Sequence, residues 1–234
     1  MTVDPAYINL FQTLETHFQK TSFPERWPIL AITTLAASPD PNHAHNLYLY
    51  LTGTTTTTAD TRKALIRRLR EALLKTIPLI GVCKPIEAIL SIAAVEQPED
   101  RDYSFTREGW QCDAANHARG VAWFEKLYRG NASDTLGLFE AHRDFAWLST
   151  EITYGLFLSD RAVLDDLDTQ LVVLPAIMSQ DLRTETHWHV RGTRRLGVSL
   201  DEVRVVWDCV KLVAGFFGNS LDRVPTVDEV EPDV

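Results

Sequence analysis

The segment 171–178, Leu-Val-Val-Leu-Pro-Ala-Ile-Met, constrains the fold most, because it is apolar on every face. It lies within a mostly apolar stretch, 166–182, that is long enough for a helix and contains Pro175. We expect Pro175 to kink this helix or to mark a new start. A helix that is apolar all round must be covered on all sides. The segment therefore predicts a layered helical core, covered either by the N-terminal half or by another subunit.

Helical periodicity and capping signals extend this prediction along the chain. We expect helices at 5–20, 60–77, 85–95, 114–128, 147–157 and 200–217, and a polar helix at 184–196. We expect Asp60 to cap the second of these helices, with Pro78 and Gly81 breaking it. Gly197 is typical of a left-handed helix end, and Ser199-Leu-Asp-Glu202 is a capping box. No segment shows convincing strand alternation, so the sequence predicts an all-α fold.

The 234 residues suggest one compact unit made of two packed halves. We expect an N-terminal helical half at 1–110, a C-terminal helical half at 111–225, and a loose acidic tail at 226–234. Gly53 and the threonines 54–58 are typical of a surface loop.

Charge and cysteine content exclude several classes of function. The net charge of −9 disfavours nucleic acid or an anionic membrane as the main partner, because both require a basic surface. No run of about 18 apolar residues predicts a transmembrane helix, and the N-terminus lacks the features of a secretory signal. Cys83, Cys112 and Cys209 are widely separated, which indicates reduced thiols and excludes dithiol redox chemistry. We expect a cytoplasmic location.

The segment 184–192, Thr-Glu-Thr-His-Trp-His-Val-Arg-Gly, is the main candidate for a functional site. On a helix, Glu185 and His189 are four residues apart and share a face. A carboxylate beside an imidazole can orient it and raise its pKa, as a general acid or base needs. The alternative is a surface helix in which Glu185 and His189 form an ordinary ion pair without a catalytic role. On a strand, His187 and His189 would share a face and could ligate a metal with Glu185.

Other candidates are weaker. His117 opens a predicted helix and could face the same cleft as His189, although a capping role is favoured. His43 and His45 could form half of a metal site, but a solvated turn is favoured because no further ligand follows at suitable spacing. No glycine-rich phosphate loop, nucleophile elbow or zinc-protease helix motif is present.

A family resemblance extends over roughly residues 145–220. The run His189-Val-Arg-Gly-Thr-Arg-Arg-Leu-Gly197-Val-Ser-Leu-Asp-Glu202-Val, with the apolar helix that ends at Gly218, resembles the carboxymuconolactone decarboxylase and alkylhydroperoxidase D-like superfamily. In that superfamily a histidine lies eight residues before a glycine, and a capped helix follows. The resemblance implies an all-helical fold and a homo-oligomer with sites near subunit contacts. The segment 70–85 resembles part of a diverged second copy.

Several positions of this chain differ from the family motif, and these differences indicate which branch of the family it resembles more. In the peroxidase branch two cysteines lie seven and four residues before the histidine, where this chain has Leu182 and Glu185, and the expected glutamate is Gln170. Peroxide reduction requires a thiolate, so a thiol peroxidase role is disfavoured. The decarboxylase branch is nearer, although its arginine-rich stretch is missing at 167–170. Arg183 or Arg191 would have to substitute.

Three hypotheses follow from these residues. The first is a cofactor-independent lyase or isomerase acting on a small lactone, carboxylated or aromatic polyketide-like compound. His189 would transfer the proton and Glu185 would orient it. The expected binding residues are Gln170, His187, Trp188, Arg191 and His117.

The second hypothesis is a catalytically inactive family member that acts as a binding or assembly protein. The third is a metal site formed by His187, His189 and Glu185; the first two need neither metal nor cofactor. The expected partners are a small-molecule ligand and a second copy of the chain, most simply in a dimer whose interface includes the 200–217 helix or its neighbours.

Overall fold

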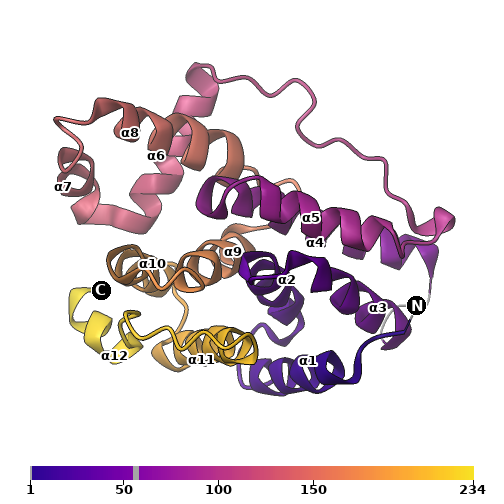
Figure 1. The fold of residues 1–234 in the computed structure, drawn as a ribbon. Coiled ribbons are helices and arrows are strands. Elements are labelled where there is room, and N and C mark those ends of the chain that lie inside the picture. Colours follow the sequence, from indigo (N-terminus) through magenta and orange to yellow (C-terminus); the bar gives the residue numbers. More distant parts are fainter. Residues whose placement is uncertain (1, 55–57) are drawn as a thin grey trace.

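The computed structural model describes residues 2–54 and 58–234, and within these ranges the chain forms helices and no strands (Figure 1). This confirms the predicted all-α fold. The N-terminal half contains α1 (Pro5–Phe18), α2 (Trp27–Ala37), α3 (Ala44–Thr54), α4 (Ala59–Ile80) and α5 (Cys83–Ala93). None of the described helices is both long and apolar enough to span a bilayer.

The C-terminal half follows an extended connection that ends at residue 113. It contains α6 (Ala114–Tyr128), α7 (Ala132–Gly137), α8 (Arg143–Trp147), a π-helix (Leu148–Leu158), α9 (Asp166–Met178), α10 (Arg183–Arg195), α11 (Leu200–Phe216) and α12 (Val227–Val230). Short 3-10 helices occupy Pro24–Arg26, Pro41–His43, Pro98–Asp100, Arg129–Asn131 and Glu231–Asp233.

Helix α9 lies at the centre of the fold, and every residue of the apolar run 171–178 is buried. Helices α2, α4, α10 and α11 of the same chain pack against it. Helices of the same chain therefore bury α9 on all sides. The expectation of a homo-oligomer then depends only on the family resemblance. Pro175 does not start a new helix, because α9 begins at Asp166 and runs through Pro175 to Met178.

Several predicted helix boundaries are confirmed and others are wrong. Gly197 has a φ of 95°, and Ser199 with Glu202 forms the expected capping box. Helix α4 runs through Pro78 to Ile80 and ends at Gly81, so the predicted break is right at Gly81 and wrong at Pro78. Thr58, not Asp60, caps α4, since the Thr58 side chain accepts a hydrogen bond from the backbone of Thr61. Of the predicted loop at 53–58, residues 55–57 lie outside the described part of the chain, and Gly53 belongs to α3.

The C-terminal tail is not loose. Val227 and Val230 are buried, and the Glu231 carboxylate accepts hydrogen bonds from Arg194 at 2.7 and 2.8 Å. Asp233 lies 2.9 Å from Nε2 of His187. Composition alone suggested a solvated acidic end, but two apolar side chains and two basic residues of α10 hold the tail in place.

The two halves have matching helix spacings. Helices α2 and α3 begin at Trp27 and Ala44, and α9 and α10 begin at Asp166 and Arg183, so each pair starts 17 residues apart. The packing is also reciprocal, since α4 contacts α9 and α11 contacts α2. We propose that the N-terminal half is a diverged copy of the C-terminal unit, packed where a second subunit would otherwise lie.

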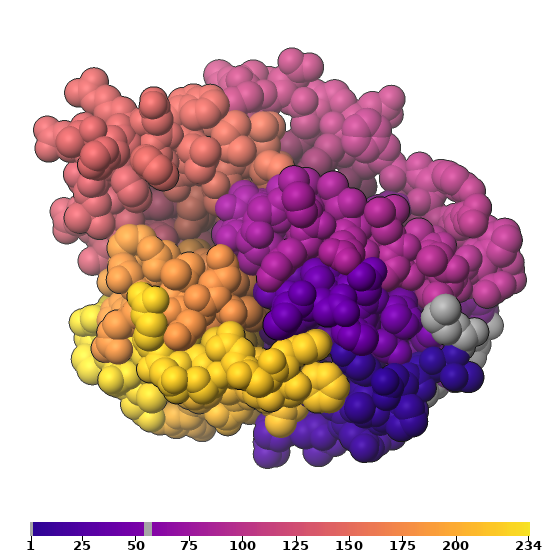
Figure 2. Space-filling view, in the orientation of Figure 1, coloured from indigo at the N-terminus to yellow at the C-terminus, as the bar shows by residue number. Residues whose placement is uncertain are grey.

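Helices α6, α7 and α8 and the π-helix form a lobe, gathered at the upper left of Figures 1 and 2. The lobe depends on a close crossing of α6 and the π-helix. A Cβ atom built on Gly120 would lie 2.3 Å from the carbonyl oxygen of Thr150 and 2.9 Å from the nitrogen of Gly155. Only glycine fits at this crossing.

Replacing Gly120 by Ala should lower the free energy of unfolding by about 3 kcal/mol, because the added methyl group overlaps backbone rather than a side chain that can move. Gly215, in α11, has open space around its Cβ position and serves as the matched control. Gly215→Ala should leave stability unchanged or raise it by up to about 1 kcal/mol. Urea unfolding of both variants tests the prediction, and equal effects would contradict it.

Candidate functional site

Helices α9 and α10 place most of the predicted site residues in one layer. Gln170, on α9, is buried and donates from Nε2 to Oγ1 of Thr193 at 3.0 Å and to the carbonyl oxygen of His189 at 3.3 Å. The side chain predicted to line the pocket therefore also fixes the backbone of α10 beside His189. His189 itself is only 5 % exposed.

Four buried side chains here have polar atoms without partners, and we call them the His189 cluster: Gln170, Thr186, His189 and Arg191. The unpaired atoms are Oε1 of Gln170, Oγ1 of Thr186, Nδ1 of His189 and Nε of Arg191. Buried polar atoms in folded proteins nearly always have a hydrogen-bond partner. These four atoms lie on two adjoining helices, where one ligand or water could supply several of the missing partners.

Arg191 is the most informative member of the His189 cluster. It is 8 % exposed, and no hydrogen bond or ion pair engages its side chain within the described residues. Its Nε is buried without a partner, and a guanidinium matches the geometry of a carboxylate or phosphate. Arg195 lies near, because the charge of Arg191, after burial, lowers its pKa. Two neighbouring positive charges favour an anion.

His189 is neutral at physiological pH. Burial, followed by the positive charge of Arg191, lowers the pKa of its imidazole to about 4. The prediction that Glu185 raises this pKa is wrong. No hydrogen bond joins Glu185 to His189 in the described structure, because Glu185 is half-buried at the edge while the His189 ring packs inward, 6.2 Å from the ring of Tyr128.

The remaining predicted residues of α10 lie around this cluster. His187 faces the C-terminal tail and contacts Asp233, and Trp188 packs edge-on against Tyr128 with ring centroids 6.2 Å apart. No group of three or more His, Cys, Asp or Glu side chains in the described chain is arranged to hold a metal ion. The geometry therefore gives no support to the metal hypothesis.

Two tyrosines complete the surroundings and were not predicted. The hydroxyl groups of Tyr128 and Tyr154 lie 3.2 Å apart, and both side chains are buried. Burial raises the pKa of both phenols, so they stay protonated and can donate hydrogen bonds. Tyr128 contacts both Trp188 and His189, and it links α6 to the His189 cluster.

His117 does not join this cluster. Its Nδ1 contacts the carboxylate of Glu151 on the π-helix. Tyr128, which contacts His189, lies eleven residues further along α6, or about 16 Å at the rise of an α-helix. His117 therefore lies near the start of α6, whereas His189, on α10, lies near the end of α6.

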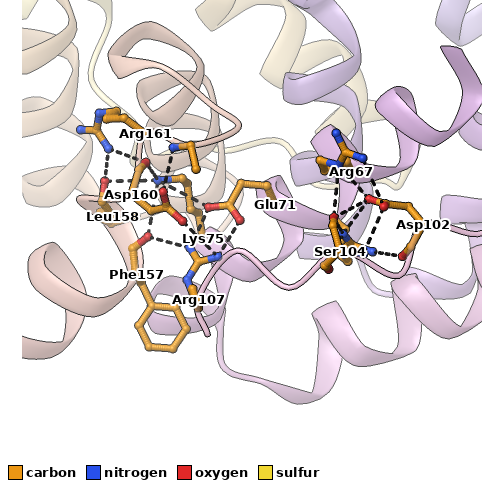
Figure 3. Close-up of polar contacts among 12 residues, drawn as sticks. Arg67, Glu71, Lys75, Asp102, Ser104, Arg107, Phe157, Leu158, Asp160 and Arg161 are labelled. Carbon is orange, nitrogen blue, oxygen red and sulfur yellow. Dashed lines mark hydrogen bonds and ion pairs between the residues drawn. The ribbon is translucent and has the colours of Figure 1, made fainter. Parts of the chain in front are cut away.

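A buried charged network holds the π-helix against α4 (Figure 3). The Lys75 ammonium is fully buried and donates to the carbonyl oxygens of Phe157, Leu158 and Asp160 at 3.4, 3.2 and 2.8 Å. Arg107, from the long connection, makes a bidentate pair with Glu71 at 2.6 and 2.7 Å. Burial lowers the pKa of Lys75 to about 7. All these groups have partners within the chain, so the network is structural.

Comparison with known proteins found sequence similarity over part of the chain. A peroxisomal protein resembles part of this chain. The chain is 28% identical over 137 residues to Peroxisomal protein 2 of Schizosaccharomyces pombe (strain 972 / ATCC 24843), and the match covers 58% of this chain and 63% of that protein. No family model matches the chain, and no solved structure matches it.

The lowered pKa of His189 predicts how stability depends on pH. The imidazole has a pKa near 6.5 in the unfolded chain and about 4 in the folded protein. The neutral imidazole therefore makes its full contribution to the free energy of unfolding above pH 6.5. About 3 kcal/mol of this free energy is lost as the pH falls from about 6.5 to 4.

Urea unfolding between pH 7.5 and 4 should show this loss in the natural protein and in His142→Gln, which changes an exposed histidine. His189→Gln should lack it, because glutamine does not titrate. A pH dependence that is identical in all three proteins would contradict the assignment.

Proposed function

We propose that the protein is a cofactor-independent lyase or isomerase that acts on a small carboxylated compound by proton transfer at His189. The observation that supports this most is Arg191, whose buried Nε has no partner in the described chain and whose charge adjoins a neutral buried imidazole. A substrate carboxylate would satisfy Arg191 with charge-assisted hydrogen bonds. The proposal extends the resemblance to the carboxymuconolactone decarboxylase branch.

Substrate binding would also prepare the histidine. A carboxylate at Arg191 would offset one of the two causes that lower the pKa of His189, and that pKa would rise towards the working pH. The neutral imidazole would then accept a proton from an acidic carbon of the substrate and become an imidazolium. In an isomerisation the imidazolium returns the proton to another carbon. In an elimination, the electron pair of the broken C–H bond forms a double bond as the leaving group departs.

A deuterium-exchange assay tests this proposal. A panel of carboxylated γ-lactones is incubated with the protein in D₂O, and proton NMR follows deuterium uptake and product formation. We expect turnover of at least one member, a loss of about 100-fold or more in His189→Gln, and unchanged turnover in the control Arg183→Met, at an exposed position. Turnover that survives in folded His189→Gln would remove His189 from the mechanism.

A second candidate function is ligand binding without catalysis. The low pKa of His189 and the missing contact with Glu185 favour it, because an imidazole with a pKa of about 4 is a weak base. In that case the panel would bind through Arg191, and no member would exchange or react.

The location within the cell is a separate proposal. The sequence leads us to expect a cytoplasmic protein, whereas the name of the matched relative refers to peroxisomes. We propose that this chain acts in peroxisomes, and a fluorescent fusion of the full chain, compared with a peroxisomal marker, distinguishes the two locations.

A further inference from the structure

The pair formed by His117 and Glu151 is a second arrangement of titratable groups, separate from the His189 cluster. Its two members come from α6 and the π-helix. Gly120 and Gly155 bring the two elements together, and the buried side chain of Asn116 donates from Nδ2 to the carbonyl oxygen of Glu151 at 2.9 Å. The backbone on which Glu151 sits is therefore fixed relative to α6.

The carboxylate of Glu151 is held as well. Glu151 is 9 % exposed, and its Oε1 contacts both Nδ1 of His117 and, at 3.2 Å, Oγ1 of Thr150. A carboxylate on Nδ1 selects the tautomer in which Nδ1 carries the hydrogen and Nε2 keeps its lone pair. The imidazole is thus oriented as a base rather than as a donor.

The free edge of this imidazole faces outward. The His117 side chain is 57% exposed, and Nε2 has no hydrogen-bond partner in the described chain. Two exposed apolar side chains precede Glu151 on the same continuous helix: Trp147 and Leu148, 55 % and 47 % exposed, lie four and three residues before it. π-Helical turns are rare, and single-turn π-bulges frequently occur at functional sites.

We propose that His117 and Glu151 form a second proton-transfer site, in which Nε2 of His117 removes a proton from a small, flat, apolar compound that rests on Trp147. His117 is the base, and Glu151 is a positioning residue that fixes its tautomer and stabilises the imidazolium formed. The C–H bond breaks, its electron pair stays with the substrate, and the proton passes from Nε2 to water. This site is independent of the function proposed for His189.

A generic base-sensitive compound, 5-nitrobenzisoxazole, tests the proposal. Removal of its C–H proton forms a nitrile as the N–O bond breaks, and the electron pair of that bond leaves as a phenolate that absorbs visible light. The natural protein should cleave it at least about tenfold faster than His117→Gln. His142→Gln, which changes an exposed histidine outside the pair, should keep the full rate. A rate in folded His117→Gln within twofold of the natural protein overturns the proposal.

Ring-nitrogen NMR separates a positioning role for Glu151 from a merely structural one. The spectrum of the natural protein should show His117 with hydrogen on Nδ1. Glu151→Gln should lose that tautomer and the rate, whereas Glu151→Asp should recover part of both. If Glu151→Gln leaves the tautomer of His117 unchanged, Glu151 has no positioning role and the proposed pair is wrong.

Discussion

Replacing Glu71 by Gln should lower the free energy of unfolding by about 3 kcal/mol, among the largest losses expected from any single isosteric change in this chain. Glu71 is 2 % exposed and is the bidentate partner of Arg107. It also lies 3.8 Å from the fully buried Lys75, whose pKa it raises against the larger effect of burial. Removing the carboxylate charge leaves the buried Lys75 and the partly buried Arg107 without their main counter-ion. The connection and the π-helix should therefore both loosen.

The matched control is Glu108→Gln, next to Arg107 in sequence but exposed. Urea unfolding should show a change of less than about 0.5 kcal/mol for this control. Amide hydrogen exchange should show faster exchange at 148–160 in Glu71→Gln, since Lys75 and Arg107 bind carbonyl oxygens at the end of the π-helix. Equal stability of the two variants would show that the network contributes little.

Replacing Arg191 by Met should have two opposite effects. Without ligand, the variant should be more stable than the natural protein by about 1 kcal/mol, because methionine fills the space without leaving a buried polar atom, Nε, unpaired. Its affinity for benzoate, a simple aromatic carboxylate, should fall by about 100-fold, the value of two charge-assisted hydrogen bonds. A group retained at a cost in stability is expected where function requires it.

Isothermal titration with benzoate measures the affinity, and urea unfolding measures the stability. Arg183→Met, one turn or more away at the exposed start of α10, is the control and should change neither quantity. If Arg191→Met is less stable than the natural protein, Arg191 stabilises the fold through contacts within the chain. The proposed anion-binding role of Arg191 would then be wrong.

Local sequence signals predicted the fold well because they act over a few residues. The capping box at Ser199, the left-handed glycine at 197 and the apolar run at 171–178 each depend on short-range chemistry. The end of α4 at Gly81 was predicted, whereas a break at Pro78 and a new start at Pro175 were not observed, since a helix can run through a proline. The π-helix was not predicted from the sequence. Its backbone hydrogen bonds join residues five apart instead of four, and the apolar pattern of 147–157 predicts only a helix.

The site was predicted only in part. The sequence placed Gln170, His189 and Arg191 together through helix spacing and resemblance, and in the structure Gln170 donates to the carbonyl oxygen of His189. It assigned Glu185 to His189 on spacing alone, but spacing does not show which way each side chain turns when one face is buried. Contacts between distant segments, such as Tyr128 with His189 or His117 with Glu151, depend on tertiary packing and leave no mark in one sequence.

The most direct test of the central claim is the titration of the His189 ring by NMR, with and without saturating benzoate. In the free protein the ring should titrate near pH 4, because it is buried beside the unpaired charge of Arg191. With benzoate bound, its pKa should rise, because the carboxylate offsets that charge. A free-protein pKa near 6.5, or a pKa that saturating benzoate leaves unchanged, would contradict a site in which Arg191 holds the substrate anion and prepares His189 for proton transfer.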